Sequence, residues 1–474
     1  MIRSALSGTA RVDITPAWPI MMAGFGQRRT ASTGVRDRIF GKALYLSDGA
    51  DALLLITADL ICIPRPLGEA VIAGIRQASE LAARQICVCA SHTHSGPAPH
   101  DAGDGAEGVA RYGPILVASL VQAGLSAIAG ARPSRVRTGV GALDLFRNRR
   151  TRGAPNLVDR RVAMLATEDA ATGAPIALLF GVGCHPVTLG WDNMQISGDF
   201  PGFAQTAIEA ALPGVNALFF NSTEGNVVPL TSPNRDALDP RGYCGGTYAD
   251  TASMGDALAQ EAVRVFHASV SRPDLEIASG RIDLDLMPNL SRLTATEAEA
   301  RLAESRETLA EFLGADFEQS GAVAHLWSAA SARVVEDDLS EPRMQRLMIA
   351  CCYYLGLSQR RTPAPAPRPV STPIQVLRIN DLDFLALPGE VLVETGQAWS
   401  RLAPSGHAFI IGLANSHLRY LPMAEHFAEP EAEVRYETVT AGLGAGSMED
   451  ALHAASRLLG ALGSPQAAWA DSAP

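Results

Sequence analysis

The sequence predicts an α/β fold with mixed central β-sheets flanked by helices, and with a helical insertion at about residues 294–360. Three observations support this. Short apolar runs typical of buried strands alternate with stretches of helical spacing. Polar residues capable of chemistry follow directly after several of the expected strands. An Ala- and Glu-rich stretch interrupts the alternation after about residue 294.

The expected elements repeat one order along the chain. A strand at 53–61, a helix at 66–83 and a strand at 86–90 form a first α/β unit. A second unit has a strand at 177–182, a helix at 200–212 and a strand at 217–220. The later elements are a strand at 383–387, a helix at 391–402, a strand at 408–412 and a last helix at 448–462.

Residues 294–373 depart from this order. Thr294 and Glu297 form a capping box that would start a helix, and two or three helices are expected from there to about residue 358. A Pro-rich connector at 363–373 should be extended and semi-rigid. The stretch either covers one face of the main domain or acts as a mobile lid over a site.

Composition and charge exclude several classes of function. The chain has 474 residues, 47% of them hydrophobic, and a formal net charge of −11. This balance argues against a protein that coats nucleic acid, and it disfavours docking to anionic lipid. We expect no membrane span, because no apolar run approaches the roughly 20 residues that one needs. Without the apolar core of a signal peptide at its N-terminus, the chain is expected to be cytoplasmic.

The seven cysteines do not indicate a disulfide framework or a zinc ribbon. Their number is odd and no Cys-x-x-Cys pair occurs. Cys87 and Cys89 lie in a short apolar run, and Cys351 and Cys352 lie in an apolar helical stretch. Such positions are typical of small buried hydrophobic residues.

Polar side chains follow five of the expected strands. Ligands bind beyond the carboxyl ends of strands in α/β sheets, so one convergent site is expected. His92, His185 and Glu390 would supply two nitrogens and one carboxylate for zinc, with one position left open for water. His94 could then stay free as a proton carrier, although a His-x-His pair alone also occurs in structural positions. The residues after the strands are His92 and His94, His185, Glu224, Glu390, and His417 with Tyr420.

The segment from Ser91 to Pro97 resembles the His-Thr-His-Ser-Gly-Pro segment of the neutral/alkaline non-lysosomal ceramidase family. Other stretches fall in the family's order, and together with residues 12–16 they extend the resemblance over roughly residues 8–440. The ordered set is specific, although no single motif is. These stretches are 148–149, 183–186, 197–202, 387–390, 420 and 436–437.

The resemblance implies a zinc hydrolase that cleaves amides, with one Zn²⁺ per chain. The implied ligands are His92, His185, Glu390 and Tyr420. The cation would have to lower the pKa of the tyrosine, although Tyr420 could instead be packed core. The main domain would be a ceramidase-like zinc hydrolase domain at 1–445, with the insertion and connector at 294–373 inside it. A C-terminal helix and tail at 446–474 would follow.

The resemblance also implies roles around the metal. His94 would be the general acid/base that protonates the leaving nitrogen. Arg149 and Tyr436 would bind substrate and stabilise the developing oxyanion, although Arg147 or Arg150 could enter the site in place of Arg149. Asp199 either orients a ligand histidine or caps the helix that follows it.

The sequence departs from the family in a way that bears on mechanism. Val228 occupies the position of the family's serine, so we expect attack by metal-activated water. Ser232 could be a displaced substitute for that serine. Glu224 stands in the same loop, where it could act as general base, contact the substrate or have a structural role.

These observations favour hydrolysis of a small soluble amide. The family's C-terminal immunoglobulin-like domain has no counterpart here, which argues against a secreted enzyme acting at a membrane surface. The alternatives are an esterase or lactonase that uses the same site, a true ceramidase acting on N-acyl sphingoid lipids, and a non-catalytic metal-stabilised binding protein. We expect no nucleic-acid partner, and a homo-oligomer is possible.

Overall fold

The fold was analysed in a computed structural model of the chain. The structure describes residues 5–25, 28, 30–99, 106–149, 157–230, 246–289, 295–320, 323, 346–347, 350–351, 353–354, 368–403, 405, 407–429, 432 and 436–462.

The larger sheet has eight strands among the described residues. Their order is β11-β9-β8-β6-β1-β3-β4-β5. Most neighbours are antiparallel, whereas β11 with β9 and β4 with β5 are parallel. The strands are β1 (Leu6–Asp13), β3 (Phe40–Ser47), β4 (Ala52–Ala58), β5 (Ile86–Ala90), β6 (Arg132–Ala142), β8 (Arg161–Asp169), β9 (Pro175–Val182) and β11 (Asn216–Asn221).

A second sheet has the order β13-β14-β15-β17, with β15 and β17 parallel. Its strands are β13 (Ile277–Leu286), β14 (Val370–Ile379), β15 (Leu382–Ala386) and β17 (Ala408–Ile411). Three strand pairs lie beside the two sheets in the described part of the chain. They are β2 (Gly34–Val35) with β10 (Gln195–Ile196), β7 (Phe146–Asn148) with β12 (Val227–Pro229), and β16 (Glu390–Val391) with β18 (Tyr420–Leu421).

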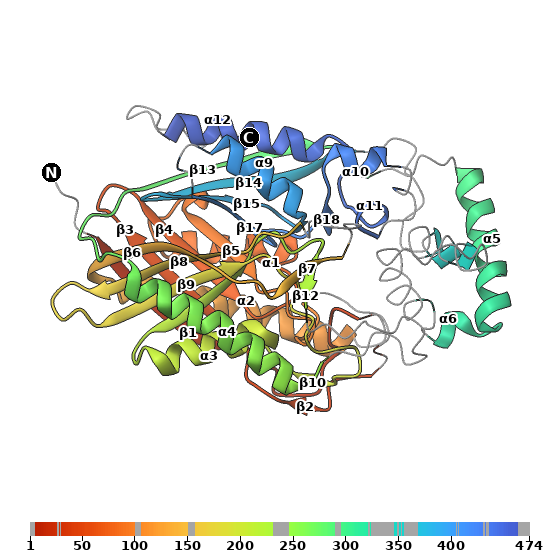
Figure 1. Ribbon diagram of the computed structural model, residues 1–474, viewed down its shortest axis with the longest axis horizontal. Helices are drawn as coiled ribbons and strands as arrows, with labels where there is room; N and C mark the ends of the chain where they lie inside the picture. The colour runs from red at the N-terminus through yellow and green to blue at the C-terminus, as the bar shows by residue number, and fades with distance from the viewer. Residues whose placement is uncertain are drawn as a thin grey trace.

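The two sheets lie between two layers of helices (Figure 1). One layer, on the larger sheet, contains α1 (Arg65–Gln77), α2 (Ala106–Ala129), α3 (Asp199–Ala211) and α4 (Tyr248–Ala268). The other, on the smaller sheet, contains α9 (Val393–Leu402) and α12 (Ser447–Leu462). The short elements are η1 (Ala83–Gln85), α10 (Ala424–Ala428) and α11 (Tyr436–Val439).

Apolar side chains fill the space between the two sheets. Leu55 and Cys89 of the larger sheet share one buried cluster with Phe384 and Ile411 of the smaller sheet. Separate clusters bury α1 and α2, α3 and α4, and α9 and α12 against their sheets. The predicted α/β class with mixed sheets and flanking helices is confirmed, and Cys87 and Cys89 are buried as expected.

The predicted insertion is helical where the structure describes it. α5 (Ala295–Leu313) and α6 (Phe317–Ser320) pack together through a small cluster that includes Leu309 and Phe317. They lie at the end of the molecule opposite the N-terminus (Figure 1). Thr294 of the predicted capping box lies outside the described residues, as do Cys352 and most of the connector. Whether the insertion is a lid stays a prediction.

Two expected boundaries are wrong. The connector was expected to reach residue 373, but β14 already begins at Val370 and Pro373 pairs with Asp283. The helix expected at 391–402 begins at Val393, because Glu390 and Val391 pair with Tyr420 and Leu421. Proline and short apolar runs carry no local signal for pairing with a strand that is remote in the chain. The division of the chain at residue 445 stays a prediction.

The long apolar helix α2 was not among the expected elements. The stretch Ala110–Ala129 of α2 has a mean hydropathy of 1.5 and could cross a membrane by length and composition alone. The expectation that no stretch approaches this length is therefore wrong, because small residues between the apolar ones keep the mean high. In the structure Leu116, Leu120 and Ala127 of α2 are buried in the cluster beneath the larger sheet. Buried core helices of soluble proteins can have the same length and composition, so these two properties are weak evidence for a membrane span.

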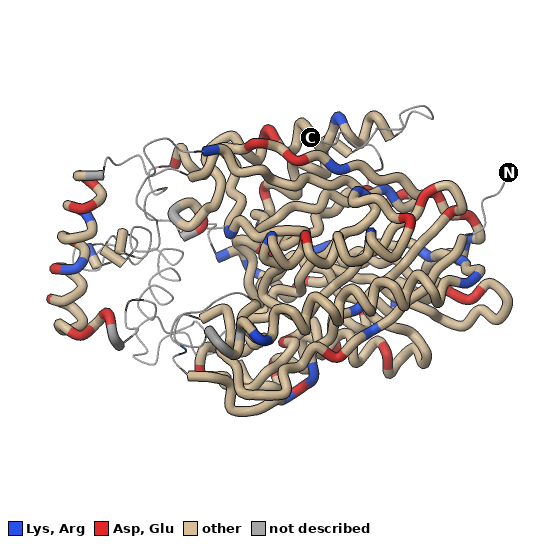
Figure 2. Tube along the Cα trace, turned by 180° about the vertical axis from the view of Figure 1, so that it is seen from behind, with Lys and Arg blue, Asp and Glu red and all other residues tan. Residues whose placement is uncertain are grey.

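Basic and acidic residues are interspersed along the described chain trace in the view from behind (Figure 2). Several form ion pairs with each other, such as Arg132 with Asp169 and Arg160 with Asp144. Exposed pairs of this kind contribute little to stability.

Candidate metal centre at the strand ends

His92 lies just after the end of β5 and its backbone is in the left-handed region, with φ 73°. Non-glycine residues adopt this conformation at a cost that the surrounding structure must offset. The ring Nδ1 lies 2.6 Å from the Ile61 carbonyl oxygen. A carbonyl can only accept, so Nδ1 carries the proton and Nε2 of the neutral ring is left with its lone pair. His92 therefore presents Nε2 as a ligand atom.

His185 follows β9 and is oriented in the same way. Its Nδ1 donates to the Glu224 carbonyl oxygen at 2.6 Å. Its Nε2 lies 3.2 Å from Glu390 Oε2 and 3.4 Å from the Tyr420 hydroxyl. Carbonyl partners of this kind fix the tautomer and ring direction of metal-binding histidines.

Glu390 and Tyr420 are placed by the short parallel pair β16 and β18, in which they are direct partners. Glu390 Oε2 lies 3.5 Å from His92 Nε2, as well as 3.2 Å from His185 Nε2. Four side chains that are far apart in the sequence thus point toward one region. The predicted ligands His92, His185, Glu390 and Tyr420 are brought together.

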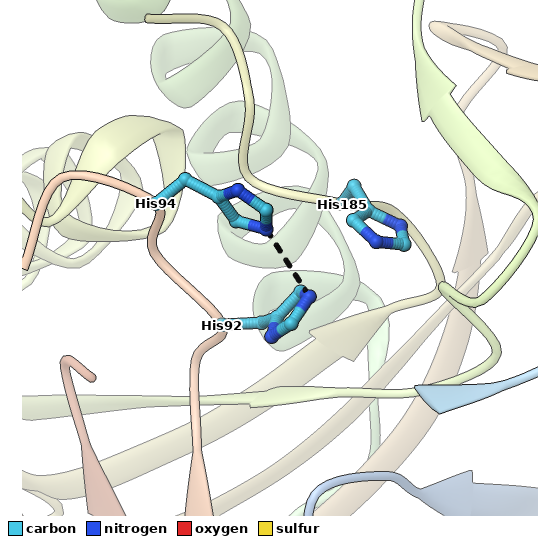
Figure 3. A group of neighbouring side chains, drawn as sticks. All are labelled: His92, His94 and His185. Atoms are coloured by element: carbon cyan, nitrogen blue, oxygen red, sulfur yellow. Dashed lines mark hydrogen bonds between the residues drawn. The ribbon is translucent and has the colours of Figure 1, made fainter. Parts of the chain in front are cut away.

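His94 completes a cluster of three imidazoles (Figure 3). One ring nitrogen from each of His92, His94 and His185 lies within 4.8 Å of the others, so the three could hold a metal ion. His94 Nε2 is 3.3 Å from His92 Nε2. His94 is only partly buried, whereas His92 and His185 are fully buried.

The spacing of the donor atoms fits a metal ion. Zinc with ligands at about 2.0–2.1 Å in a tetrahedron has ligand atoms about 3.3 Å apart. The distances from Glu390 Oε2 to the two histidine nitrogens are 3.2 and 3.5 Å, and Tyr420 to His185 is 3.4 Å. Nitrogen and oxygen donors of this kind suit zinc and related divalent metals. The residues present therefore fit the metal that the family resemblance implies.

The electrostatics keep protons off His185 and Glu390 near neutral pH. Burial lowers the pKa of His185 to about 4, and the Arg149 charge acts in the same direction. Burial alone would raise the pKa of Glu390, but the neighbouring His92, His185 and His417 hold it well below its usual range. Metal binding needs deprotonated ligands, so both shifts favour it.

Asn221 joins the strand ends that carry the ligands. Its side-chain nitrogen donates to the carbonyl oxygens of Ser91 and Cys184, both at 3.0 Å, next to His92 and His185. Its side-chain oxygen accepts from the backbone N–H of Cys184 at 3.2 Å and of Ser222 at 3.1 Å. No role for Asn221 was expected from the sequence, because nothing local distinguishes such a residue from any other asparagine in a loop.

Arg149 enters the site next to the tyrosine. Its Nη2 donates to the Tyr420 hydroxyl at 3.0 Å and to the Gly225 carbonyl oxygen at 2.9 Å. Its Nε pairs with Glu437 at 3.0 Å. Although burial opposes it, Tyr420 and Glu437 raise the pKa of Arg149, so the side chain is cationic. Arg147 lies in β7 with Val228 as its strand partner, and Arg150 lies outside the described residues.

Glu224 lies behind His185. Its backbone carbonyl holds the Nδ1 of His185, on the ring side opposite Nε2. The carboxyl is fully buried, and no hydrogen-bond partner is found for either oxygen among the described residues. It packs against Gly412, where an added Cβ would lie 2.9 Å from Oε2. Burial raises the pKa of Glu224 well above its usual range, and the Glu390 charge adds to this.

The remaining predicted residues are Asp199, Tyr436 and Ser232. Asp199 contacts neither histidine ring. Instead it accepts from the backbone N–H of Phe200 at 2.7 Å and of Leu189 at 3.1 Å, and from the Thr188 hydroxyl. It thereby holds the loop after His185 against the start of α3. Tyr436 lies in α11 but its side chain is outside the described part of the structure, and so is Ser232.

His417 is a neighbour of the site for which the sequence indicated no role. Its Nε2 lies 3.5 Å from Glu390 Oε1, the carboxylate oxygen that does not face His92 and His185. Burial opposes protonation of His417, but Cys62 and Glu390 beside it raise its pKa to about 10. A charged His417 would hold Glu390 in its observed orientation.

Comparison with known proteins shows what the chain and its fold resemble. Residues 6–102 match the family model described as neutral/alkaline non-lysosomal ceramidase, N-terminal. The resemblance to that family is confirmed. The crystal structure of neutral ceramidase from Pseudomonas aeruginosa is similar with a TM-score of 0.70 and 19% identity, covering 97% of this chain and 74% of that one.

A second solved structure, a ceramidase complexed with C2, gives a TM-score of 0.70 at 18% identity, covering 97% of this chain and 75% of that chain. At these identities the likeness establishes the fold. The chain therefore has the fold of the matched ceramidase structures, with side chains that could hold a metal at the ends of its strands.

Proposed function

We propose that this ceramidase-like chain is a zinc-dependent hydrolase that cleaves the C–N bond of a small soluble amide. The observation that carries the proposal is the meeting of His92, His185 and Glu390: Glu390 Oε2 lies 3.5 Å from His92 Nε2 and 3.2 Å from His185 Nε2, distances suited to one shared ion. Tyr420 adds a fourth donor beside them. One Zn²⁺ per chain would occupy this position.

A zinc ion bound there would supply Lewis-acid chemistry and lower the pKa of a water molecule to roughly 7. The chain's own residues hold and orient the groups around it. The carbonyls of Ile61 and Glu224 fix both histidine rings, and Glu390 supplies negative charge. This division keeps His94 outside the proposed ligand set and places the Arg149 charge beside Tyr420, where both residues can act on the substrate.

His94 is proposed as the general acid that protonates the leaving nitrogen. It is the most exposed histidine of the cluster, and its Nε2 lies beside the proposed ligands. Burial lowers the pKa of His94 well below its ordinary value, and the nearby His92 and His185 add to the effect. The resting ring is therefore neutral near pH 7, so it has to take up a proton before it can pass one to the leaving nitrogen.

Arg149 is proposed to stabilise the developing oxyanion, because its charge is fixed next to Tyr420 by Glu437 and Gly225. Tyr436 stays a predicted substrate-binding residue. The buried Val228 in β12 supports a mechanism without the family's serine nucleophile. The carboxyl of Glu224 is fully buried and packs against Gly412, and its backbone carbonyl holds His185, so a supporting role is proposed for it in place of general base.

The substrate class rests on the sequence departures and stays a proposal, as does the cytoplasmic location. The matched structures are named as ceramidases, so the fold favours hydrolysis of N-acyl sphingoid lipids as the second candidate. Hydrolysis of an ester or lactone at the same site, and a non-catalytic binding role, are further candidates. A panel of small amides, matched esters and short-chain ceramides separates them.

The test compares one amide and one ester with the same acyl group. Amides need leaving-group protonation more than activated esters do, so His94→Ala should lower kcat/KM for the amide by roughly 10²–10⁴-fold and for the ester far less. His453→Ala, on an exposed position of α12, is the control and should change neither. Equal losses on both substrates would refute the acid role. No turnover of any panel member by metal-loaded protein would favour the binding protein.

A further inference from the structure

The backbone of Gly24 lies directly over the His94 imidazole. Gly24 has φ +98°, and a Cβ added there would lie 2.6 Å from His94 Cγ and Nδ1. Ala23 N donates to the Gly96 carbonyl oxygen at 3.0 Å, which fixes this segment beside the His94 loop. Only glycine allows the backbone to approach the ring so closely.

Arg28 binds the backbone of this loop from the interior. The side chain is 5% exposed. Its N–H groups donate to the carbonyl oxygens of Ala23 at 2.7 Å, Gly190 at 3.1 Å and Trp191 at 3.2 Å, and also to that of His94 itself. One guanidinium thus holds three segments, because its N–H donors diverge in a rigid plane.

An aromatic ring links Arg28 to the His94 side chain. The Arg28 Cζ lies 4.9 Å from the centre of the Phe25 ring. The Phe25 ring in turn meets the His94 ring edge-on, with centres 5.1 Å apart and an interplanar angle of 62°. Arg28 therefore contacts His94 twice, through the backbone carbonyl and through Phe25.

We propose that Arg28, acting with Phe25, is a positioning residue for His94. It fixes the backbone and the ring plane so that His94 Nε2 stays beside His92 Nε2 (Figure 3). This inference rests on the proposed role of His94 as general acid. A buried guanidinium whose described hydrogen bonds all go to carbonyl oxygens is costly to desolvate, and a role in holding His94 accounts for its place there.

The contacts to Gly190 and Trp191 allow a competing explanation. These residues follow His185, so Arg28 could act by holding a metal ligand instead. The two explanations differ in measurable ways. Loss of a metal-positioning residue reduces metal content and impairs amides and esters alike, whereas loss of an acid-positioning residue spares the metal and impairs amides selectively.

The test uses Arg28→Lys and Phe25→Leu in the full chain, with Arg36→Lys as control. Arg36 also stacks on an aromatic ring, Tyr248 at 4.8 Å, but lies outside the site. Lysine keeps the charge without the planar fork, and Phe25→Leu leaves Arg28 in place should Arg28→Lys not fold. We expect zinc content to be unchanged, kcat for the amide to fall at least tenfold more than for the ester, and the control to match wild type.

A second readout does not depend on activity. The ¹⁵N imidazole signals of the zinc-loaded protein should show one His94 ring environment in the wild type and exchange between several in either variant. An unchanged His94 signal with an unchanged amide-to-ester ratio would overturn the proposal, and so would loss of zinc. If the wild type cleaves no amide, the proposed function fails, while the His94 signals still decide whether Arg28 and Phe25 hold the ring.

Discussion

His92 and His185 owe their direction to backbone carbonyls. Ile61 and Glu224 each accept from an Nδ1 at 2.6 Å, so both Nε2 atoms face the same point. Glu390 uses one oxygen toward these nitrogens and the other toward His417. At this scale the proposed metal site depends as much on groups behind the ligands as on the ligands themselves.

His417→Asn tests the group behind Glu390. The variant loses the cation that faces Glu390 Oε1 at 3.5 Å, so the carboxylate should be less well oriented for a metal. We expect zinc affinity, measured by competition with a chelator, to fall roughly 10–100-fold. His407→Asn, at an exposed position, is the control. An affinity for His417→Asn within twofold of wild type would show that His417 does not support the site.

Asp37 should make the stability of the fold depend on pH. Burial raises its pKa to about 6, although hydrogen bonds from Ser197 and Gly198 act against the shift. In the unfolded chain this carboxyl has a pKa near 3.8, so the folded state binds more protons between about pH 4 and 6. The free energy of unfolding therefore falls as the pH rises through that window and stays lower above it.

Asp37→Asn removes this penalty and can still accept the Gly198 N–H bond of 2.8 Å. We expect the variant to have a higher Tm than wild type above pH 6, with the difference vanishing near pH 4. Asp316→Asn, at an exposed position, should show no such trend. A lower Tm for Asp37→Asn at pH 7 would mean that the ionised carboxylate stabilises the fold.

At the scale of elements, five strand ends deliver the site. β5 and β9 precede the two ligand histidines, β11 precedes Glu224, and the short pair of β16 with β18 sets Glu390 beside Tyr420. Asn221 joins the ends of β5, β9 and β11 through bonds to Ser91 and Cys184. The strand ends therefore cannot shift independently of one another.

Asn221→Ala tests this connection. The change leaves buried backbone groups of Ser91 and Cys184 without partners, at about 1–3 kcal/mol each. We expect a loss of about 2–4 kcal/mol in the free energy of unfolding, measured in urea, together with weaker zinc binding. Asn216→Ala, at the opposite end of β11, loses bonds to Thr9 and Ala10 and should destabilise the fold without weakening zinc binding. Equal effects on zinc binding in both variants would show that Asn221 has no special link to the site.

At the scale of the whole molecule, the fold places two sheets face to face between helices (Figure 1). The sequence predicted the strands that are buried on both faces, such as β5 at Ile86–Ala90, because their apolar runs are continuous. It did not predict β6, whose exposed and buried residues do not alternate regularly. Nor did it predict β16 and β18, because two-residue strands have no periodicity to detect.

More of the candidate site than of the fold could be predicted from the sequence. His92, His185, Glu390 and Tyr420 lie in motifs, and the structure brings all four together. Asn221, Arg28 and the role of His417 could not be predicted, since each acts through contacts with residues remote in the chain. For Glu224 the sequence indicated a loop near the site but not which way its carboxyl turns.

The central claim is that one divalent ion is held by side chains from three separate strand ends. Anomalous diffraction at the zinc edge, on crystals of protein loaded with one equivalent of zinc, tests it most directly. We expect one peak at about 2.0–2.2 Å from Nε2 of His92, Nε2 of His185 and a Glu390 oxygen. A folded, zinc-loaded protein with no peak at that point, or with its zinc elsewhere, would contradict the claim.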